Sequence, residues 1–245
     1  MKPTRSDCLA TLFLLSLAVL FGCRTQQPAH PASPLAEEKS VRPGINADYL
    51  KADLEVSQWT ERFEKEGREI YDRRNEIVAA ARIRRGSAVA DIGAGTGLFT
   101  PLLADAVGPK GKVYAVDVVP KFVEHIRQRA AKLGIKNVQT VLCTERSVEL
   151  RANSIDLAFL CDVYHHFEYP QSSLASLHTA LRPGGELFLV DFKRIPGVSS
   201  DWVINHVRAG QEVVTDEIEA AGFQEIEQID LLKENYVVRF RKPRK

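Results

Sequence analysis

The stretch that decides the fold reads Val89-Ala90-Asp91-Ile92-Gly93-Ala94-Gly95-Thr96-Gly97. It begins as a short apolar strand and runs directly into three glycines at alternate positions. Glycines let the backbone adopt turns that a Cβ atom obstructs and pass close to a bound molecule. In open α/β sheets, ligands bind beyond the carboxyl ends of the strands. This loop is therefore the first candidate for a binding site.

Strand and helix patterns alternate on the C-terminal side of this loop. We predict further strands at 112–118, 138–143, 155–161 and 186–192. One helix follows the glycine loop and ends near Val107, and three others span 120–133, 171–181 and 211–221. Two closely spaced strands, 223–231 and 234–241, end the chain. The alternation predicts a parallel sheet covered on both faces, and the last two strands are too close for a helix between them. The predicted class is α/β, a doubly wound, mostly parallel seven-stranded sheet with an antiparallel C-terminal hairpin.

The glycine spacing separates two classes of nucleotide site. The dinucleotide pattern GxGxxG would place its third glycine at Leu98, whereas the sequence has it at Gly97. A nicotinamide oxidoreductase is therefore disfavoured. Asp117 ends the second predicted strand, where an acid accepts hydrogen bonds from both ribose hydroxyls in nucleotide-binding folds.

Together these motifs resemble those of class I S-adenosylmethionine-dependent methyltransferases. The glycine loop resembles their first motif, Val113 to Asp117 their second, and Leu181-Arg182-Pro183-Gly184-Gly185 the turn before their fifth strand. The similarity covers roughly residues 55–242. It implies a Rossmann-like methyltransferase fold, S-adenosyl-L-methionine as the cofactor and methyl transfer as the activity.

On the methionine side of the cofactor, the resemblance implies that Gly93 and Gly95 lie against the tail and that Asp91 orients the loop. Asp162, at the end of the fourth strand, would face the methionine amino group. The complete predicted cofactor set is Asp91, Gly93, Ala94, Gly95, Gly97, Asp117, Val118, Thr144, Glu145 and Asp162.

On the adenosine side, the resemblance implies that Asp117 holds the ribose and Val118 packs on the adenine. The acid that commonly meets the adenine amino group in this family is not cleanly present. Glu145 is the candidate for that contact, and Thr144 is the weaker alternative.

The acceptor side offers His165 and His166, which follow the fourth strand and are the predicted catalytic residues. Adjacent side chains in extended backbone point to opposite sides, so we expect at most one to face the pocket. We favour His165 as a general base or substrate ligand; the alternative is that both only cap or pack the strand end. Tyr71 and His206 are predicted to close over the substrate. No third ligand at a suitable spacing is evident, so no metal site is predicted.

The N-terminus resembles a bacterial lipoprotein signal peptide over residues 1–23, in which a charged start and an apolar run lead to Cys23. A lipidated Cys23 would attach the protein to a membrane; an uncleaved anchor or a plain secretory signal are the alternatives. Residues 24–49 are proline-rich and predicted to form a disordered or semi-extended tether. Residues 50–245 would form the methyltransferase domain, with an N-terminal helical lid over 50–82.

The expected location is the cell envelope, facing the periplasm or exterior. S-adenosylmethionine is made in the cytoplasm, so cytoplasmic retention remains an alternative.

Composition narrows the acceptor class. The chain has 33 basic and 32 acidic residues and a net charge of +1. A large nucleic-acid interface normally needs a clustered basic excess, so nucleic acid is disfavoured and a small-molecule or lipid acceptor is favoured. The leading function is methyl transfer to such an acceptor, and the alternative is a membrane-tethered cofactor-binding or scaffold protein without transfer activity.

Overall fold

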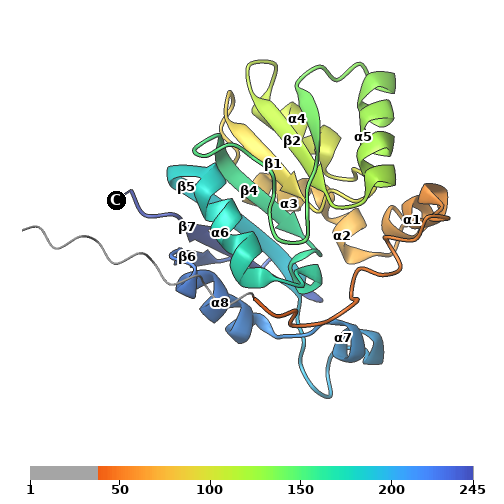
Figure 1. The fold of residues 1–245 in the computed structure, drawn as a ribbon, viewed down its shortest axis with the longest axis vertical. Helices are drawn as coiled ribbons and strands as arrows, with labels where there is room; N and C mark the ends of the chain where they lie inside the picture. Colours follow the sequence, from red (N-terminus) through yellow and green to blue (C-terminus); the bar gives the residue numbers. More distant parts are fainter. Residues whose placement is uncertain (1–37, 245) are drawn as a thin grey trace, which may run out of the picture. The chain divides into compact units, whose positions relative to one another are not determined.

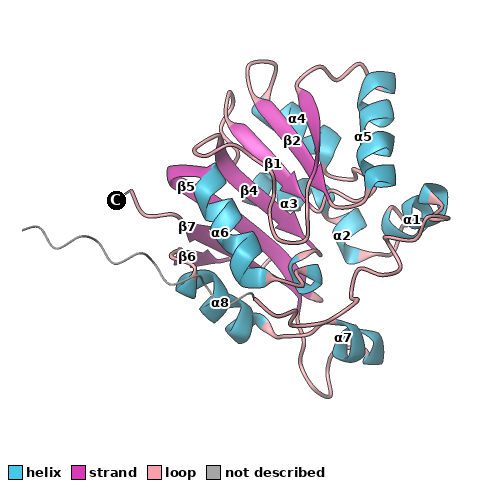
Figure 2. Ribbon diagram, viewed as in Figure 1, coloured by secondary structure: helices cyan, strands magenta, loops and turns pink. Residues whose placement is uncertain are grey.

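The computed structural model describes residues 38–244, so the predicted signal peptide, Cys23 and residues 24–37 lie outside the described part. Seven strands form one sheet in the order β3-β2-β1-β4-β5-β7-β6 (Figures 1 and 2). Their bounds are β1 Ala88–Ile92, β2 Lys112–Asp117, β3 Val138–Leu142, β4 Ile155–Cys161, β5 Leu181–Phe192, β6 Gln224–Gln228 and β7 Asn235–Arg241.

Strands β1 to β5 are parallel, whereas β7 lies antiparallel between β5 and β6. The predicted fold class is confirmed: this is the Rossmann-like methyltransferase fold with its antiparallel C-terminal hairpin. The turn at 181–185 is a local irregularity inside β5, since the pairing with β4 jumps from Ile155–Leu181 to Leu157–Glu186.

Helices cover both faces of the sheet. The helical segments are α1 Val56–Phe63, α2 Glu69–Asp72, α3 Arg74–Ala80, α4 Thr100–Val107, α5 Pro120–Lys132, η1 Tyr164–His166, α6 Pro170–Ala180, α7 Asp201–His206 and α8 Gln211–Ala220. Side chains of α3 and α4 pack with Val89 and Phe159 on one face. Side chains of α6 and α8 pack with Ala90 and Leu160 on the other. Successive strand residues thus serve opposite cores, which explains why these strands are apolar without alternation.

The N-terminal part differs from the prediction in two ways. The single helical pattern expected over 50–82 is divided into α1, α2 and α3, with Gly67 at a φ of +87° in the break before α2. Residues 38–49, predicted to be part of the disordered tether, instead lie against the domain. The Glu38 carboxylate accepts hydrogen bonds of 2.8 Å from the backbone N–H groups of Gln171 and Ser172. The first N–H groups of a helix have no partner within it, and Glu38 satisfies two of them at the start of α6.

Helix α7 was not predicted, although its start carries a recognisable signal. The Ser200 hydroxyl accepts a 3.3 Å hydrogen bond from the Val203 N–H, which is an N-cap of the common kind. The helix has six residues and brings His206 toward the end of the sheet where the parallel strands finish. Among the described residues, no helix is both long and apolar enough to cross a membrane.

The glycine loop after β1 can be tested through Gly93. It has a φ of +63°, and a Cβ added there would come within 2.1 Å of a Val163 methyl group. Gly44 has a φ of +76° but open space around it, which makes it a matched control. We expect Gly44→Ala to lower the free energy of unfolding by roughly 1–2 kcal/mol, because alanine disfavours the left-handed conformation. We expect Gly93→Ala to cost a further 1–3 kcal/mol or so from overpacking.

The comparison is made by urea unfolding of both variants and the wild type. Equal costs for the two substitutions would show that the loop does not press against Val163. Adding Val163→Ala to Gly93→Ala should recover part of the lost stability.

Candidate functional site

The carboxylate of Asp117 connects the glycine loop to the end of β2. One oxygen accepts a 2.7 Å hydrogen bond from the Gly95 N–H, and the other accepts a 2.8 Å bond from the Val119 N–H. The residue is 5% exposed, and burial raises its pKa to about 6. Each carboxylate oxygen can accept about two hydrogen bonds, so both retain acceptor capacity.

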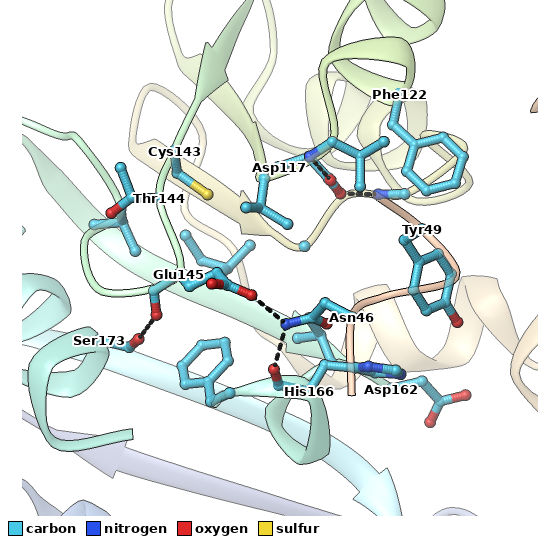
Figure 3. Close-up of a pocket in the computed structure, with 18 of the residues that line it drawn as sticks. Asn46, Tyr49, Asp117, Phe122, Cys143, Thr144, Glu145, Asp162, His166 and Ser173 are labelled. Atoms are coloured by element: carbon cyan, nitrogen blue, oxygen red, sulfur yellow. Dashed lines mark hydrogen bonds between the residues drawn. The ribbon is translucent and has the colours of Figure 1, made fainter. Parts of the chain in front are cut away.

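Asp117 opens onto a cavity that we call the Asp117 cavity (Figure 3). Its volume of about 810 Å³, open mouth included, falls within the range of small-molecule sites. Among the residues of the predicted cofactor set, Gly93, Gly95, Asp117, Val118, Thr144, Glu145 and Asp162 line it. The structure therefore brings together both predicted ends of the cofactor site.

The Asp117 cavity fits an adenosine with a charged tail. Beside Asp117, the walls include the apolar side chains of Val118, Phe122 and Val148, which suit a planar base. The backbone of Gly93 and Gly95, both with positive φ, forms another part of the wall. Polar acceptors near a sugar and apolar walls near a base are the complement that this ligand requires.

Glu145, the candidate adenine contact, already has a partner in this structure. Its carboxylate accepts a 3.3 Å hydrogen bond from the Asn46 side chain, which also donates to the His166 carbonyl oxygen at 3.2 Å (Figure 3). Asn46 belongs to the N-terminal segment that was expected to be disordered. The segment thus contributes to the cavity wall, together with Tyr49.

A second cavity, which we call the His206 cavity, shares Gly93, Gly95 and Asp162 with the first. Asp91 and Ala94 of the predicted set line this second cavity. The shared lining residues mean that the two cavities adjoin. Two adjoining cavities that meet at a glycine loop are the arrangement that transfer between two ligands needs.

Asp162 lies at the shared wall and is held by two partners. Its carboxylate forms an ion pair with the Arg68 guanidinium and accepts a 2.6 Å hydrogen bond from the Asn235 side chain. Burial raises the pKa of Asp162 to about 6, against the opposing effect of Arg68. Its φ of +51° is uncommon for a residue with a side chain, and the two partners fix it there. The pairing of Asp162 with Arg68 and Asn235 was not anticipated from the sequence.

Both predicted catalytic histidines line the His206 cavity, contrary to the expectation that at most one would. They lie in the 3-10 turn η1 rather than in extended backbone, and their ring centroids are 4.4 Å apart. Successive residues of such a turn point roughly a third of a circle apart, so neighbours can face one space. His206, the predicted lid residue, extends from α7 and completes a group of three histidines. One ring nitrogen of each lies within 4.8 Å of the others.

The three imidazoles differ in their electrostatic surroundings. Burial lowers the pKa of His166 to about 2 and that of His206 to about 4. Burial alone would also lower the pKa of His165, but the Asp191 carboxylate outweighs this effect and raises the pKa above its ordinary value. Asp191 accepts a hydrogen bond from His165 Nδ1 at 2.7 Å and another from the His165 N–H at 3.0 Å.

Two predicted site residues line neither cavity. A Cβ at Gly97 would lie 3.0 Å from Ile126, so this glycine allows the loop to pass close to α5 instead of a ligand. Tyr71 stacks under the Arg74 guanidinium, 4.2 Å from its ring centre, while its helix neighbour Ile70 lines the His206 cavity. Helix residues one apart point about 100° away from each other, so the correct helix was predicted with the wrong face.

Sequence reasoning also missed Asp191, Tyr49 and Asn46. Asp191 had a usable signal, because an acid near the end of a predicted parallel strand lies at the ligand-binding edge. Tyr49 and Asn46 had none, since they belong to an irregular segment whose path is set by contacts with distant residues.

Comparisons with known proteins agree with the fold and the glycine loop. Residues 90–189 match the family model of the methyltransferase domain. A ubiquinone/menaquinone biosynthesis C-methyltransferase of Burkholderia mallei is 28% identical over 118 residues, 48% of each chain. The chain therefore spans about half the length of the curated relatives it matches.

Among solved structures, a SAM-dependent methyltransferase from Aquifex aeolicus has a TM-score of 0.69 and is 26% identical. That match covers 77% of this chain and 99% of the other. The [4+2]-cyclase SpnF has a TM-score of 0.62 at 18% identity, covering 74% and 85% of the two chains. The second likeness shows the fold alone.

Asp91 provides a pH test of the buried site. Its carboxylate accepts a 2.6 Å hydrogen bond from the Thr100 hydroxyl, and burial raises its pKa to about 7 from 3.8. The folded protein thus holds this proton more tightly than the unfolded chain, so stability falls as the pH rises from about 4 to about 7. Asp91→Asn cannot ionise, so this variant should become more stable relative to the wild type between about pH 5 and pH 8.

Urea unfolding at the two pH values measures this change. The matched control is Asp105→Asn, at an exposed aspartate of α4. If the difference in unfolding free energy between Asp91→Asn and the wild type stayed constant across the two pH values, the pKa of Asp91 would not be raised by folding.

Proposed function

We propose that this chain is an S-adenosylmethionine-dependent methyltransferase that holds its cofactor in the Asp117 cavity and its acceptor in the His206 cavity. The main observation behind this proposal is the buried Asp117 carboxylate, which is hydrogen-bonded to the glycine loop and lines a cavity of suitable size. The methyltransferase family match over residues 90–189 and the Aquifex aeolicus neighbour support the proposal.

The cofactor, when bound, supplies a methyl group on a positively charged sulfur. Asp117 would accept hydrogen bonds from the ribose hydroxyls, and Val118 would pack on the adenine. Asp162, at the shared wall, would face the amino group of the methionine tail, and its ion-pair partner Arg68 lines the adjoining His206 cavity, where it could meet the tail carboxylate. Since the sulfur charge is lost during transfer, alignment of the reactants and exclusion of water are the main contributions of the protein.

The acceptor is proposed to be a small molecule or a membrane-associated molecule with an aromatic or otherwise apolar body. The His206 cavity is lined by Tyr49, Phe192 and Trp202. Next to it, the segment between β5 and α7 exposes Ile195 by 45% and Val198 by 77%. Exposed apolar side chains beside a cavity favour contact with an apolar molecule or a membrane surface.

Where the acceptor nucleophile carries a proton, we propose that the cluster of His165, His166 and His206 removes that proton. The cluster contains the predicted catalytic residues His165 and His166. A base is needed only for such acceptors. His206 and Tyr49 line the His206 cavity, and we assign to them the lid role first given to Tyr71 and His206.

The alternative function is a cofactor-binding or scaffold protein without transfer activity, because a fold does not by itself specify chemistry. Transfer of a labelled methyl group from S-adenosylmethionine into lipid or aqueous extracts distinguishes the two. Cofactor binding without any labelled product in either extract would favour the scaffold.

Cofactor binding is tested by calorimetric titration with S-adenosylhomocysteine, S-adenosylmethionine and NAD. We expect both sulfur nucleosides to bind and Asp117→Asn to weaken them by about tenfold or more, since at least one charge-assisted hydrogen bond is lost. Asp105→Asn should leave affinity unchanged. Tight NAD binding with no response to either sulfur nucleoside would overturn the proposal.

We further propose that lipidation at Cys23 anchors the domain at a membrane of the cell envelope. Acyl chains contribute roughly 0.8 kcal/mol per buried CH₂, so the wild type should label with a fatty-acid analogue and fractionate with membranes. Cys23→Ser should lose the label, whereas Cys143→Ser should keep it. Unlabelled wild-type protein in the cytosol would refute the anchor.

A further inference from the structure

Three histidines that are distant in sequence meet at one wall of the His206 cavity. His165 and His166 come from η1, and His206 comes from α7. One ring nitrogen of each lies within 4.8 Å of the others. The Nε2 atoms of His166 and His206 are 3.3 Å apart, and two nitrogens about 2.05 Å from a tetrahedral zinc ion are separated by about 3.3 Å.

We propose that His165, His166 and His206 form a binding site for a divalent transition metal ion, with an open coordination position toward the His206 cavity. Imidazole nitrogens suit zinc, iron, nickel and copper. Three protein ligands with a free position are typical of catalytic rather than structural sites.

The surroundings of His165 match those of a metal ligand. Its Nδ1 is bonded to Asp191 at 2.7 Å, so Nε2 is the nitrogen left for a metal. A ligating histidine commonly gives its other ring nitrogen to a carboxylate, which fixes the ring and strengthens it as a ligand. The side chains of His165 and Asp191 are 4% and 2% exposed. A cation on the far nitrogen would compensate this buried carboxylate.

Aromatic packing holds the other two rings in place. Trp202 stacks on His206 with ring centroids 4.6 Å apart and an interplanar angle of 19°. Tyr49 meets the His166 ring edge-on at 5.2 Å. Within residues 38–244 the buried Nδ1 atom of His166 has no hydrogen-bond partner, and its Nε2 atom faces only the Nε2 atom of His206, the other proposed ligand. Rings fixed before the metal arrives lower the entropic cost of binding it.

The site has a chemical consequence that rests on the proposed methyl transfer. A metal at this wall would face the space assigned to the acceptor, and metal ions lower the pKa of groups that coordinate them. An acceptor hydroxyl or thiol would therefore lose its proton to solvent more readily there, and with the metal bound this route would replace direct proton removal by the imidazoles. This narrows the acceptor class to molecules whose nucleophile is an oxygen or a sulfur that can coordinate a metal.

The test uses the full chain without a polyhistidine tag, stripped with a chelator and titrated calorimetrically with Zn²⁺. Co²⁺ provides a second readout through its visible absorption. We expect one metal per chain in the wild type and at least about a hundredfold weaker binding in His206→Ala. Asp191→Asn should bind roughly 10–100-fold more weakly, because the second partner of His165 is changed.

The matched control is His125→Ala, at a partly exposed position of α5 outside both cavities, which should bind zinc like the wild type. Circular dichroism and titration with S-adenosylhomocysteine verify that each variant is folded. Zinc binding that survives unchanged in His206→Ala, or a folded wild type that binds no zinc, would overturn the site.

The two proposals fail separately. Nucleoside binding without zinc binding would remove the metal site and leave the methyltransferase proposal in place. Zinc binding lost in His206→Ala, in a chain that binds neither sulfur nucleoside, would support the metal site and remove the methyltransferase proposal together with the acceptor role.

Discussion

The site depends on one constraint: a buried carboxylate at the end of β2 must be satisfied by the backbone of the neighbouring loop. Asp117 accepts from Gly95 and Val119, so the glycine loop and the start of α5 are both positioned by one side chain. Burying a carboxylate is costly unless it is hydrogen-bonded, and the two N–H groups offset that cost without using all of its acceptor capacity. The same contacts that fold the loop therefore leave a polar group facing the cavity.

This arrangement recurs along the edge where the parallel strands end. Asp91 in β1, Asp117 in β2, Asp162 after β4 and Asp191 in β5 are all buried acids or nearly so. Each is held by its own donors: a threonine hydroxyl, two backbone amides, a guanidinium with an amide side chain, and a histidine ring. The partners differ in charge, and the acids consequently face different ligands. Asp117 suits hydroxyl groups, Asp162 lies at a charged wall, and Asp191 orients an imidazole.

The N-terminal segment adds a wall to this edge that the sheet cannot supply. Glu38 binds the start of α6, and Asn46 reaches both Glu145 and the His166 carbonyl. Figure 1 shows this segment running along the end of the sheet from the α8 side toward α1. A cavity covered in this way excludes water better than an open crevice, which favours chemistry on charged groups.

The sequence by itself determined the succession of strands and helices along the chain, the position of the glycine loop and the position of Asp117. These features follow from short-range patterns: apolar runs, alternate glycines and an acid at a strand end. It placed His165 and His166 at the correct strand but not their directions, since a 3-10 turn and an extended strand leave no distinct mark in two residues. Only the tertiary structure decided that His206 and Trp202 join them, that Asp191 holds His165, and that Asn46 and Tyr49 cover the cavity. These contacts join segments 26 to 120 residues apart, and no periodicity in the sequence encodes where an irregular segment packs.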